Sequence, residues 1–175
     1  DDKGCQDIAT QLVKIYDPAN LQVDFSFPSL ICSNTAISFT DLSTATEDLP
    51  TNFYWDFAGQ GNSVDQNAQF TFNAGGIYDI YLTVTGISGC EKTVMKTINI
   101  IEGAIPAFSA QDDCLVSPIN FINTSVGGNS YQWDFGDGTT SIEESPSVQY
   151  TAPGVYDITL NVTNAAGCIT STTDQ

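Results

Sequence analysis

The sequence predicts an all-β protein built from tandem β-sandwiches of immunoglobulin-like architecture, each with about seven strands. Three observations lead to this fold class. Apolar residues are 41% of the chain, which is enough for a buried core. They are mainly Val, Ile, Phe, Tyr and Leu set among Thr, Ser, Asn and Gly, a composition that favours strands and turns over helices. The two tryptophans of the chain lie in two segments of similar sequence, which predicts two copies of one unit.

The repeat sets the expected domain borders. Tyr54-Trp55-Asp56-Phe57 recurs 78 residues later as Gln132-Trp133-Asp134-Phe135, and the run 76–85 recurs at the same offset as 154–163. Lys3-Gly4-Cys5 and the apolar residues after it resemble Gly89-Cys90 and the strand that follows. We therefore expect residues 1–17 to be the C-terminal strand of a preceding repeat. Residues 18–102 would form one repeat, and residues 103–175 a second repeat that lacks a complete last strand.

Short segments bounded by Gly, Asn and Pro predict the strands. In chain order they are expected at 21–27, 36–42, 52–57, 68–72, 78–85 and 92–101, then at 104–110, 118–123, 130–135, 147–151, 156–162 and 169–174. In the strand at 78–85 apolar and polar residues alternate, so one face should be buried. Trp55 and Trp133 lie on the third strand, where such a sandwich buries its central aromatic side chain. The Gly-x-Tyr motifs that end in Tyr78 and Tyr156 are typical of a tyrosine corner, in which the tyrosine hydroxyl bonds to nearby backbone.

Charge and composition exclude several classes of function. The chain has 21 acidic and 4 basic residues, a net charge of −17, and no histidine. Without histidine there is no Ser-His-Asp hydrolase, Cys-His protease or imidazole metal site. The negative charge would repel nucleic acid and anionic membranes. No apolar run is long enough to span a bilayer. We therefore expect no nucleic-acid binding, because of the charge, and no membrane insertion, because no segment could span the membrane.

The second unit resembles the polycystic-kidney-disease (PKD) domain. The resemblance rests on Trp133-Asp134-Phe135-Gly136-Asp137-Gly138, on Pro146 and Tyr150, and on Gly154-x-Tyr156 leading into Leu160-Asn161-Val162. The first unit keeps Trp55-Asp56-Phe57 and Tyr78 but has Ala58-Gly59-Gln60-Gly61 in place of Gly-Asp-Gly. The resemblance implies a seven-stranded sandwich without intrinsic catalysis, and therefore no enzyme activity and no cofactor in this segment.

We expect the chain to be exported, and five cysteines in an exported chain suggest disulfides. The topology of the sandwich places the first corner, with Cys32 or Cys114, and the last turn, with Cys90 or Cys168, at opposite poles. A bridge needs α-carbons within about 7 Å, so an inter-repeat pair Cys32–Cys168 is favoured. Cys5, and then Cys90 and Cys114, would bond to residues outside this segment. The alternative keeps each bridge inside one repeat, as Cys32–Cys90 and Cys114–Cys168.

Aspartates near the turn after the third strand are candidate calcium ligands. Asp134 and Asp137 flank this turn, Asp56 matches the first of them, and Asp112-Asp113 form an adjacent pair. Calcium takes six to eight oxygen ligands, and two acids are too few. The favoured interpretation is that these carboxylates accept hydrogen bonds from turn amides.

The placement of the cysteines is similar to that in long surface proteins of gliding Bacteroidota, where tandem PKD arrays form adhesins exported by type IX secretion. This similarity predicts that the chain is a structural segment of the stiff extracellular shaft of a cell-surface adhesin or filament of the gliding-motility type. Its partners would be the neighbouring repeats of the same chain. A surface polysaccharide or another cell-surface ligand would bind through regions outside this segment. The alternative is an accessory binding or spacer module of a secreted polysaccharide hydrolase or protease.

Overall fold

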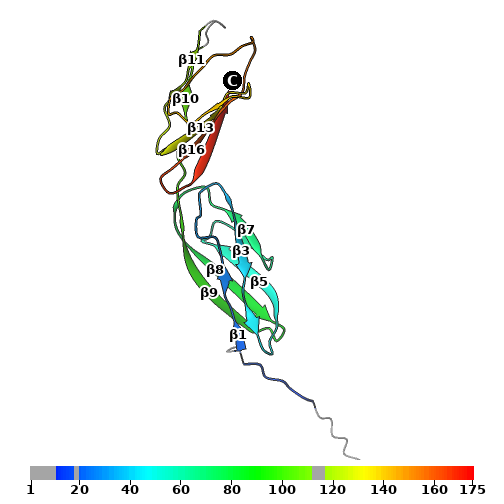
Figure 1. The fold of residues 1–175 in the computed structure, drawn as a ribbon. Helices are drawn as coiled ribbons and strands as arrows, with labels where there is room; N and C mark the ends of the chain where they lie inside the picture. The colour runs from blue at the N-terminus through cyan, green and yellow to red at the C-terminus, as the bar shows by residue number, and fades with distance from the viewer. Residues whose placement is uncertain (1–10, 18–19, 112–116) are drawn as a thin grey trace, which may run out of the picture. The chain divides into compact units, whose positions relative to one another are not determined.

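The computed structural model describes residues 11–17, 20–111 and 117–175. Every extended regular element in these residues is a β-strand, which confirms the all-β fold class. None of the described residues forms a helix long and apolar enough to cross a bilayer. Figure 1 shows the strands of the first repeat in blue to green and those of the second repeat in yellow-green to red.

The described residues of the first repeat form nine strands. One sheet has the order β6-β5-β8-β9, a second has β2-β3-β7, and β1 pairs with β4. The strands are β1 (Leu21–Gln22), β2 (Phe25–Ser26), β3 (Ala36–Asp41), β4 (Thr44–Ala45), β5 (Pro50–Phe57), β6 (Asn62–Ser63), β7 (Ala68–Thr71), β8 (Gly76–Gly86) and β9 (Glu91–Ile100).

The second repeat reproduces this order with shorter strands. Its main sheet is β14-β13-β16-β17, and two small pairs, β10-β12 and β11-β15, accompany it. The strands are β10 (Phe108–Ser109), β11 (Ile119–Asn120), β12 (Ile122–Asn123), β13 (Ser130–Asp134), β14 (Thr140–Ser141), β15 (Ser147–Val148), β16 (Ile158–Thr163) and β17 (Ile169–Asp174).

Backbone contacts divide the chain into two compact units that do not coincide with the repeats. One unit comprises the described residues within 1–26, 39–68 and 80–96. The other comprises 27–38, 69–79 and 97–175. Three segments of the first repeat therefore belong to the same compact unit as the whole second repeat.

An aromatic cluster forms the core of each repeat. In the first repeat Phe25 lies edge-on to Trp55, with ring centroids 5.1 Å apart. In the second repeat Phe108 and Trp133 repeat this contact at 5.2 Å. Both tryptophans are fully buried, and their indole N–H groups donate to backbone carbonyls ten residues ahead. The alternation in β8 also holds from residue 80 onward, because Ile80, Leu82 and Val84 are buried while the intervening positions contact solvent.

Several expected strands are shorter or broken. The segment 21–27 forms two short strands because its two halves have different partners: Leu21–Gln22 pairs with β4, whereas Phe25–Ser26 pairs with β3. Only Phe108–Ser109 is a strand within 104–110, where Pro106 lacks an N–H to donate. The sequence analysis missed β4, β6 and β14, which have two residues each and too little alternation to be recognised.

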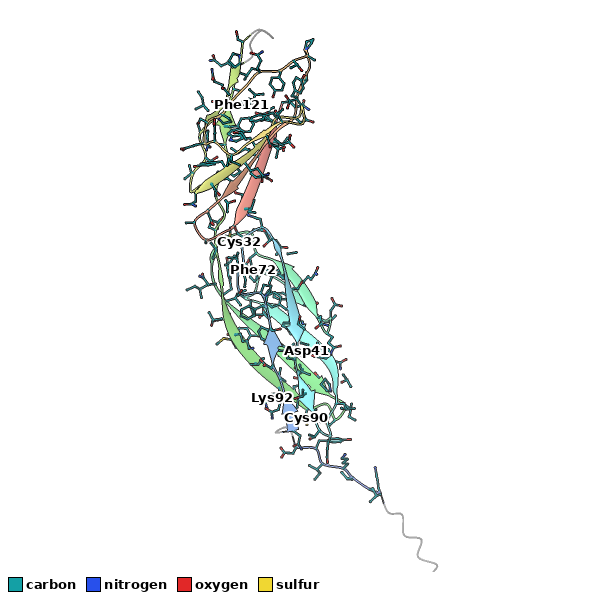
Figure 2. All side chains as sticks on the ribbon, viewed as in Figure 1. Cys32, Asp41, Phe72, Cys90, Lys92 and Phe121 are labelled. Carbon is teal, nitrogen blue, oxygen red and sulfur yellow. A yellow bond between two sulfur atoms is a disulfide. The ribbon has the colours of Figure 1, made fainter. Side chains whose placement is uncertain are left out.

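Two lysines of β9 bind the first strand of the first repeat (Figure 2 labels Lys92). The Lys92 Nζ donates to the carbonyl of Leu21 at 2.7 Å. Lys96 donates to the carbonyl of Phe25 and forms an ion pair with Asp24 at 2.6 Å. Its hydrogen bond lowers the pKa of the Asp24 carboxyl. These two lysines thus join backbone carbonyls of β1 and β2 to β9.

Candidate functional site at the disulfide junction

Cys32 and Cys168 form a disulfide, with α-carbons 5.7 Å apart and a sequence separation of 136 residues. Cys32 comes from the first repeat and Cys168 from the second, and both lie in the same compact unit. Figure 2 labels Cys32, and two residues further along the N–H of Asn34 donates to the carbonyl of Phe72 at 2.7 Å. Cys168 is buried, at 1% exposure, so the bond is shielded from solvent on that side.

Backbone hydrogen bonds hold Cys32 beside the end of the first repeat. Ser33 N donates to the carbonyl of Ile101 at 2.9 Å, and Ile101 N donates to the carbonyl of Ile31 at 2.8 Å. The Thr35 hydroxyl donates to the carbonyl of Cys32 at 2.7 Å. The loop that carries Cys32 is therefore fixed to Ile101, which directly precedes the linker between the repeats (residues 102–106).

An Asn-x-x-Gly-Cys turn positions Cys168. The Asn164 side-chain oxygen accepts the N–H groups of Ala166 and Cys168 at 3.0 and 2.9 Å. Gly167 has a φ of 95°, a left-handed conformation that favours glycine. Because both features are local to the sequence, the turn places the sulfur of Cys168 without help from distant residues.

Glu102 connects three loops around the disulfide. Its carboxylate accepts the Ser33 hydroxyl at 3.3 Å and, in a short hydrogen bond, the N–H of Gly75. Its backbone carbonyl accepts the Asn164 side-chain N–H at 2.8 Å. A β-carbon at Gly75 would lie 2.8–3.0 Å from atoms of Glu102, so this close approach requires glycine.

The linker packs directly on β17. A β-carbon at Gly103 would lie 2.5 Å from the Thr170 methyl carbon. The Thr170 hydroxyl donates to the carbonyl of Ala104 at 2.7 Å. The linker is therefore held by the Cys32–Cys168 disulfide beside it, by the carboxylate of Glu102 and by the hydroxyl of Thr170.

The predicted calcium candidates that the structure describes are turn-forming residues. Asp134 accepts the N–H of Gly136 at 3.0 Å. Asp137 accepts both the N–H and the hydroxyl of Thr139 at 2.8 and 2.6 Å, and the hydroxyl bond lowers the pKa of its carboxyl. Asp56 makes the matching bond to Gly59 N at 2.8 Å. No group of three or more potential ligands that could hold a metal ion occurs among the described residues.

The remaining motif residues build the sandwich around this turn. Phe57 and Phe135 are buried beside the tryptophans. Gly136 and Gly138 have φ values of 70° and 89°, and a β-carbon at Gly136 would lie 2.8 Å from the carbonyl oxygen of Asp157. The hydroxyls of Tyr78 and Tyr156 donate to carbonyls four residues earlier, at 3.1 and 2.8 Å. This bond defines the tyrosine corner.

A model of the PKD domain matches the chain twice, at residues 21–101 and 109–175. The chain belongs to the PKD domain family. PKD domains and disulfides are both typical of extracellular proteins. The two matched ranges include both tryptophans, the turn aspartates and the tyrosine corners, whereas Phe108 lies just before the second range.

Two curated relatives and one solved structure are similar to parts of the chain. The pre-pro-metalloprotease PrtV of Vibrio cholerae serotype O1 (strain M66-2) is 53% identical over 38 residues, which cover 22% of this chain and 4% of the relative. The microbial collagenase of Vibrio alginolyticus is 43% identical over 44 residues, which cover 25% of this chain and 5% of the relative. The crystal structure of the PKD1 domain of the Vibrio cholerae metalloprotease PrtV has a TM-score of 0.41 and 20% identity. This alignment covers 45% of this chain and 93% of that domain.

The intra-repeat disulfides that the sequence left open as an alternative are not formed in this structure. Cys90 carries a free thiol, and Cys168 is bonded to Cys32, so the intra-repeat pairs Cys32–Cys90 and Cys114–Cys168 are not formed. These pairs do not form because the first corner and the last turn of one sandwich lie at opposite poles, whereas a disulfide needs α-carbons within about 7 Å. Cys5 and Cys114 lie outside the described residues, as do Asp112 and Asp113.

Sequence reasoning missed the residues that surround the disulfide. Glu102 was considered only as a domain border, and Ser33, Gly75 and Thr170 carried no motif. Asn164 and Gly167 did carry a signal, because Asn-x-x-Gly before a cysteine is a turn pattern. The contacts of Glu102 join residues 69 and 27 positions away, and no local pattern reports such distances.

Tyr150 gives the second PKD repeat a predictable response to alkaline pH. Burial raises its pKa to about 12, with smaller contributions from Asp137 and Tyr156, and its hydroxyl donates to the Phe135 carbonyl at 3.0 Å. The unfolded chain ionises near pH 10 while the folded chain keeps this proton, so stability should fall between pH 10 and 12. Urea unfolding across this range should show the decline, and Tyr150→Phe should make it shallower. An unchanged slope in that variant would contradict the assignment.

Proposed function

We propose that this chain is a non-catalytic spacer within an exported protein, in which a disulfide fastens neighbouring PKD domains to one another. The observation that carries the proposal is the Cys32–Cys168 bond together with the hydrogen bonds of Glu102 beside it. A tensile load applied through the chain ends cannot separate these loops without breaking a covalent bond. The mechanism is thus mechanical and requires no cofactor.

We assign the spacer to the accessory region of a secreted protease or polysaccharide hydrolase. The support is the similarity to segments of a Vibrio metalloprotease and a Vibrio collagenase, of which this chain covers 4% and 5%. Such small shares suit modules that accompany a catalytic domain rather than contain it. The net charge of −17 would keep the spacer soluble and separate from other acidic surfaces.

The second candidate is a repetitive shaft of a cell-surface adhesin. Such an adhesin would be of the gliding-motility type and would be exported by type IX secretion. One observation favours it, namely that the turn before Cys90 repeats the turn before Cys168. Gly89 and Gly167 both have left-handed φ values, 84° and 95°. In each turn, the cysteine carbonyl accepts an N–H from the residue four positions earlier, Gly86 or Asn164, at 2.9 Å. Cys90 would then bond to the preceding repeat as Cys168 bonds to Cys32, and a cell-surface ligand would bind elsewhere.

Force spectroscopy on the 175-residue chain tests the mechanical role. With handles at both ends, the oxidised chain should unfold without releasing the residues between Cys32 and Cys168. Reductant should add a contour length of roughly 450–490 Å, which is 136 residues at 3.3–3.6 Å each. Cys168→Ala should show the longer contour without reductant, and Cys90→Ala should behave as the unsubstituted chain. Equal contours in oxidised and reduced chains would overturn the proposal.

Electron microscopy of the intact protein from its natural source separates the two candidates. A spacer in a secreted enzyme should appear as a short connection beside a globular catalytic domain. An adhesin shaft should appear as a thin beaded filament of many repeats. The filament would exclude the enzyme-associated assignment, and the globular particle would exclude the shaft.

A further inference from the structure

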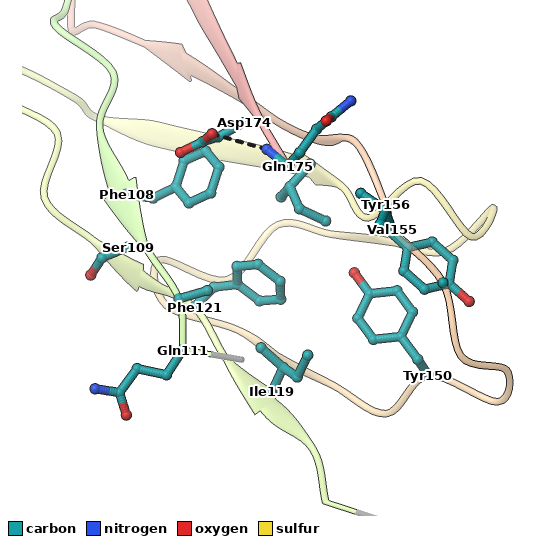
Figure 3. Close-up of a pocket in the computed structure, with 13 residues that line it drawn as sticks. Phe108, Ser109, Gln111, Ile119, Phe121, Tyr150, Val155, Tyr156, Asp174 and Gln175 are labelled. Carbon is teal, nitrogen blue, oxygen red and sulfur yellow. Dashed lines mark hydrogen bonds between the residues drawn. The ribbon is translucent and has the colours of Figure 1, made fainter. Parts of the chain in front are cut away.

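A buried carboxylate lies beside the turn that carries Cys90. Asp48 is 0% exposed, and no other charged side chain of the described residues is buried. Figure 3 shows the more usual case, in which the exposed Asp174 accepts the N–H of Gln175 at 2.9 Å. A charge loses its hydration when it is buried, so it must have hydrogen-bond donors within reach. The donors to Asp48 therefore identify its role.

Ser88, in the turn between β8 and β9, supplies two donors to Asp48. Its N–H donates to Oδ1 of Asp48 at 2.9 Å, and its hydroxyl donates to Oδ2 at 2.7 Å. The same hydroxyl oxygen accepts the N–H of Cys90 at 3.1 Å. The backbone adds a further bond, because the N–H of Ile87 donates to the carbonyl of Leu49 at 3.0 Å. The loop 46–49 between β4 and β5 thus holds the turn 86–90.

The second repeat stabilises the matching turn with a side chain from within it. The side-chain oxygen of Asn164 accepts the N–H groups of Ala166 and Cys168. These two residues stand 78 positions after Ser88 and Cys90, so the same two amides are bonded in both repeats. Only the acceptors differ. They are one local amide oxygen in the second repeat, and a distant carboxylate with a serine hydroxyl in the first.

Gly86 shows that the two kinds of acceptor occupy one place. It stands 78 positions before Asn164, and a β-carbon there would lie 2.3–2.4 Å from the carboxyl atoms of Asp48. Gly86 has no left-handed φ, so the space taken by Asp48 is the reason for glycine. Conversely, Val126 stands 78 positions after Asp48 and is 65% exposed. An asparagine within the turn and a buried carboxylate beside it are therefore alternative ways to build the same turn.

We propose that Asp48 is the positioning residue of Cys90 and makes bond formation at this thiol depend on the folded loop 46–49. The Cys168 turn is specified by residues within it, so it can form before the rest of its sandwich. The Cys90 turn takes its acceptor from a residue 40 positions away from Ser88, so it forms only in the folded repeat. The thiol is then held in one direction only after folding. This inference rests on the bonding role of Cys90 in the second candidate function.

Hydrogen exchange of the 175-residue chain, followed by NMR, tests the role of Asp48. Asp48→Ala should speed exchange at the amides of Ser88 and Cys90 about tenfold or more, because one loses its acceptor and the other loses the anchor of its acceptor. Gly86→Asn should lower protection in the unsubstituted chain, where it collides with Asp48. In the Asp48→Ala chain it should restore protection, since it can accept both amides as Asn164 does. Unchanged exchange in Asp48→Ala, or lower protection from Gly86→Asn in both chains, would overturn the proposal.

Two single variants complete this experiment. Ser88→Ala keeps the backbone donor to Asp48 but removes the hydroxyl, so exchange should speed at residue 90 and not at residue 88. Ser88 is exposed, so this variant still folds if Asp48→Ala does not. Glu47→Ala is the matched control, because it removes a neighbouring carboxylate that is 57% exposed and should change neither amide. Faster exchange at both residues in Ser88→Ala, or at either in Glu47→Ala, would contradict the assigned contacts and overturn the proposal.

Alkylation of Cys90 by iodoacetamide connects the turn to the thiol. Mass spectrometry of the peptide that contains Cys90 should show faster labelling in Asp48→Ala and the original rate when Gly86→Asn is added. A labelling rate that Asp48→Ala leaves unchanged would overturn the proposal. Neither experiment requires a bonding partner, so their failure contradicts the role of Asp48 alone. A free Cys90 in the intact protein from its natural source would instead contradict the second candidate function.

Discussion

Replacing Cys168 by alanine is expected to lower the free energy of unfolding by about 5 kcal/mol. The disulfide closes a loop with a sequence separation of 136 residues, and the loop-entropy estimate for that length gives this value. Cys168 is buried, so alanine leaves only a small cavity in addition. Urea unfolding under non-reducing conditions, followed by far-ultraviolet circular dichroism, measures the change.

Three companion variants make this result specific. Cys32→Ala should cost about as much as Cys168→Ala, and the double variant should cost no more than either, because one bond is lost in each case. Cys90→Ala should change stability little, since Cys90 carries a free thiol. Additive losses in the double variant would mean that the cysteines stabilise the chain separately. A large loss of stability from Cys90→Ala would mean that Cys90 forms a stabilising bond in the folded chain, which contradicts its free thiol.

Replacing Trp133 by alanine is expected to cost about 3–5 kcal/mol and to unfold the second repeat preferentially. The indole is fully buried, contacts the rings of Phe108, Phe121 and Phe135, and donates to the Glu143 carbonyl at 2.9 Å. Alanine leaves a large cavity and an unpaired carbonyl. The remaining tryptophan, Trp55, lies in the first repeat, so its fluorescence reports on that repeat alone while circular dichroism reports on both.

Smaller changes at the same sheet provide the comparison for Trp133→Ala. Trp133→Phe keeps an aromatic ring but loses the indole hydrogen bond, and it should cost less than alanine. Ile142→Ala removes a side chain that is 82% exposed and should change stability by less than about 0.5 kcal/mol. A loss for Trp133→Ala no larger than that for Ile142→Ala would contradict the assigned core.

The fold follows from the sequence because its signals are local and occur twice. The offset of 78 residues between Trp55 and Trp133 predicts the tandem organisation. The alternation in β8 identifies the buried face, since side chains of a strand point to opposite sides of a sheet. Strand ends were less predictable. Whether a residue joins a ladder depends on its neighbour, as at residues 154–157, which resemble part of β8 but have no described strand beside them.

The turn that carries Cys168 can also be predicted from the sequence, but the contacts that surround the disulfide cannot. Asn164 and Gly167 specify a turn by hydrogen bonds and a left-handed φ within five residues, so the position of Cys168 is locally determined. Glu102 had no such signal, because its partners Ser33 and Gly75 meet it only after loops from different strands converge. Sequence alone determined the sandwich, its aromatic core and its tyrosine corners. Only the tertiary structure decided which cysteines pair, since that depends on which loops share one end of a folded sheet.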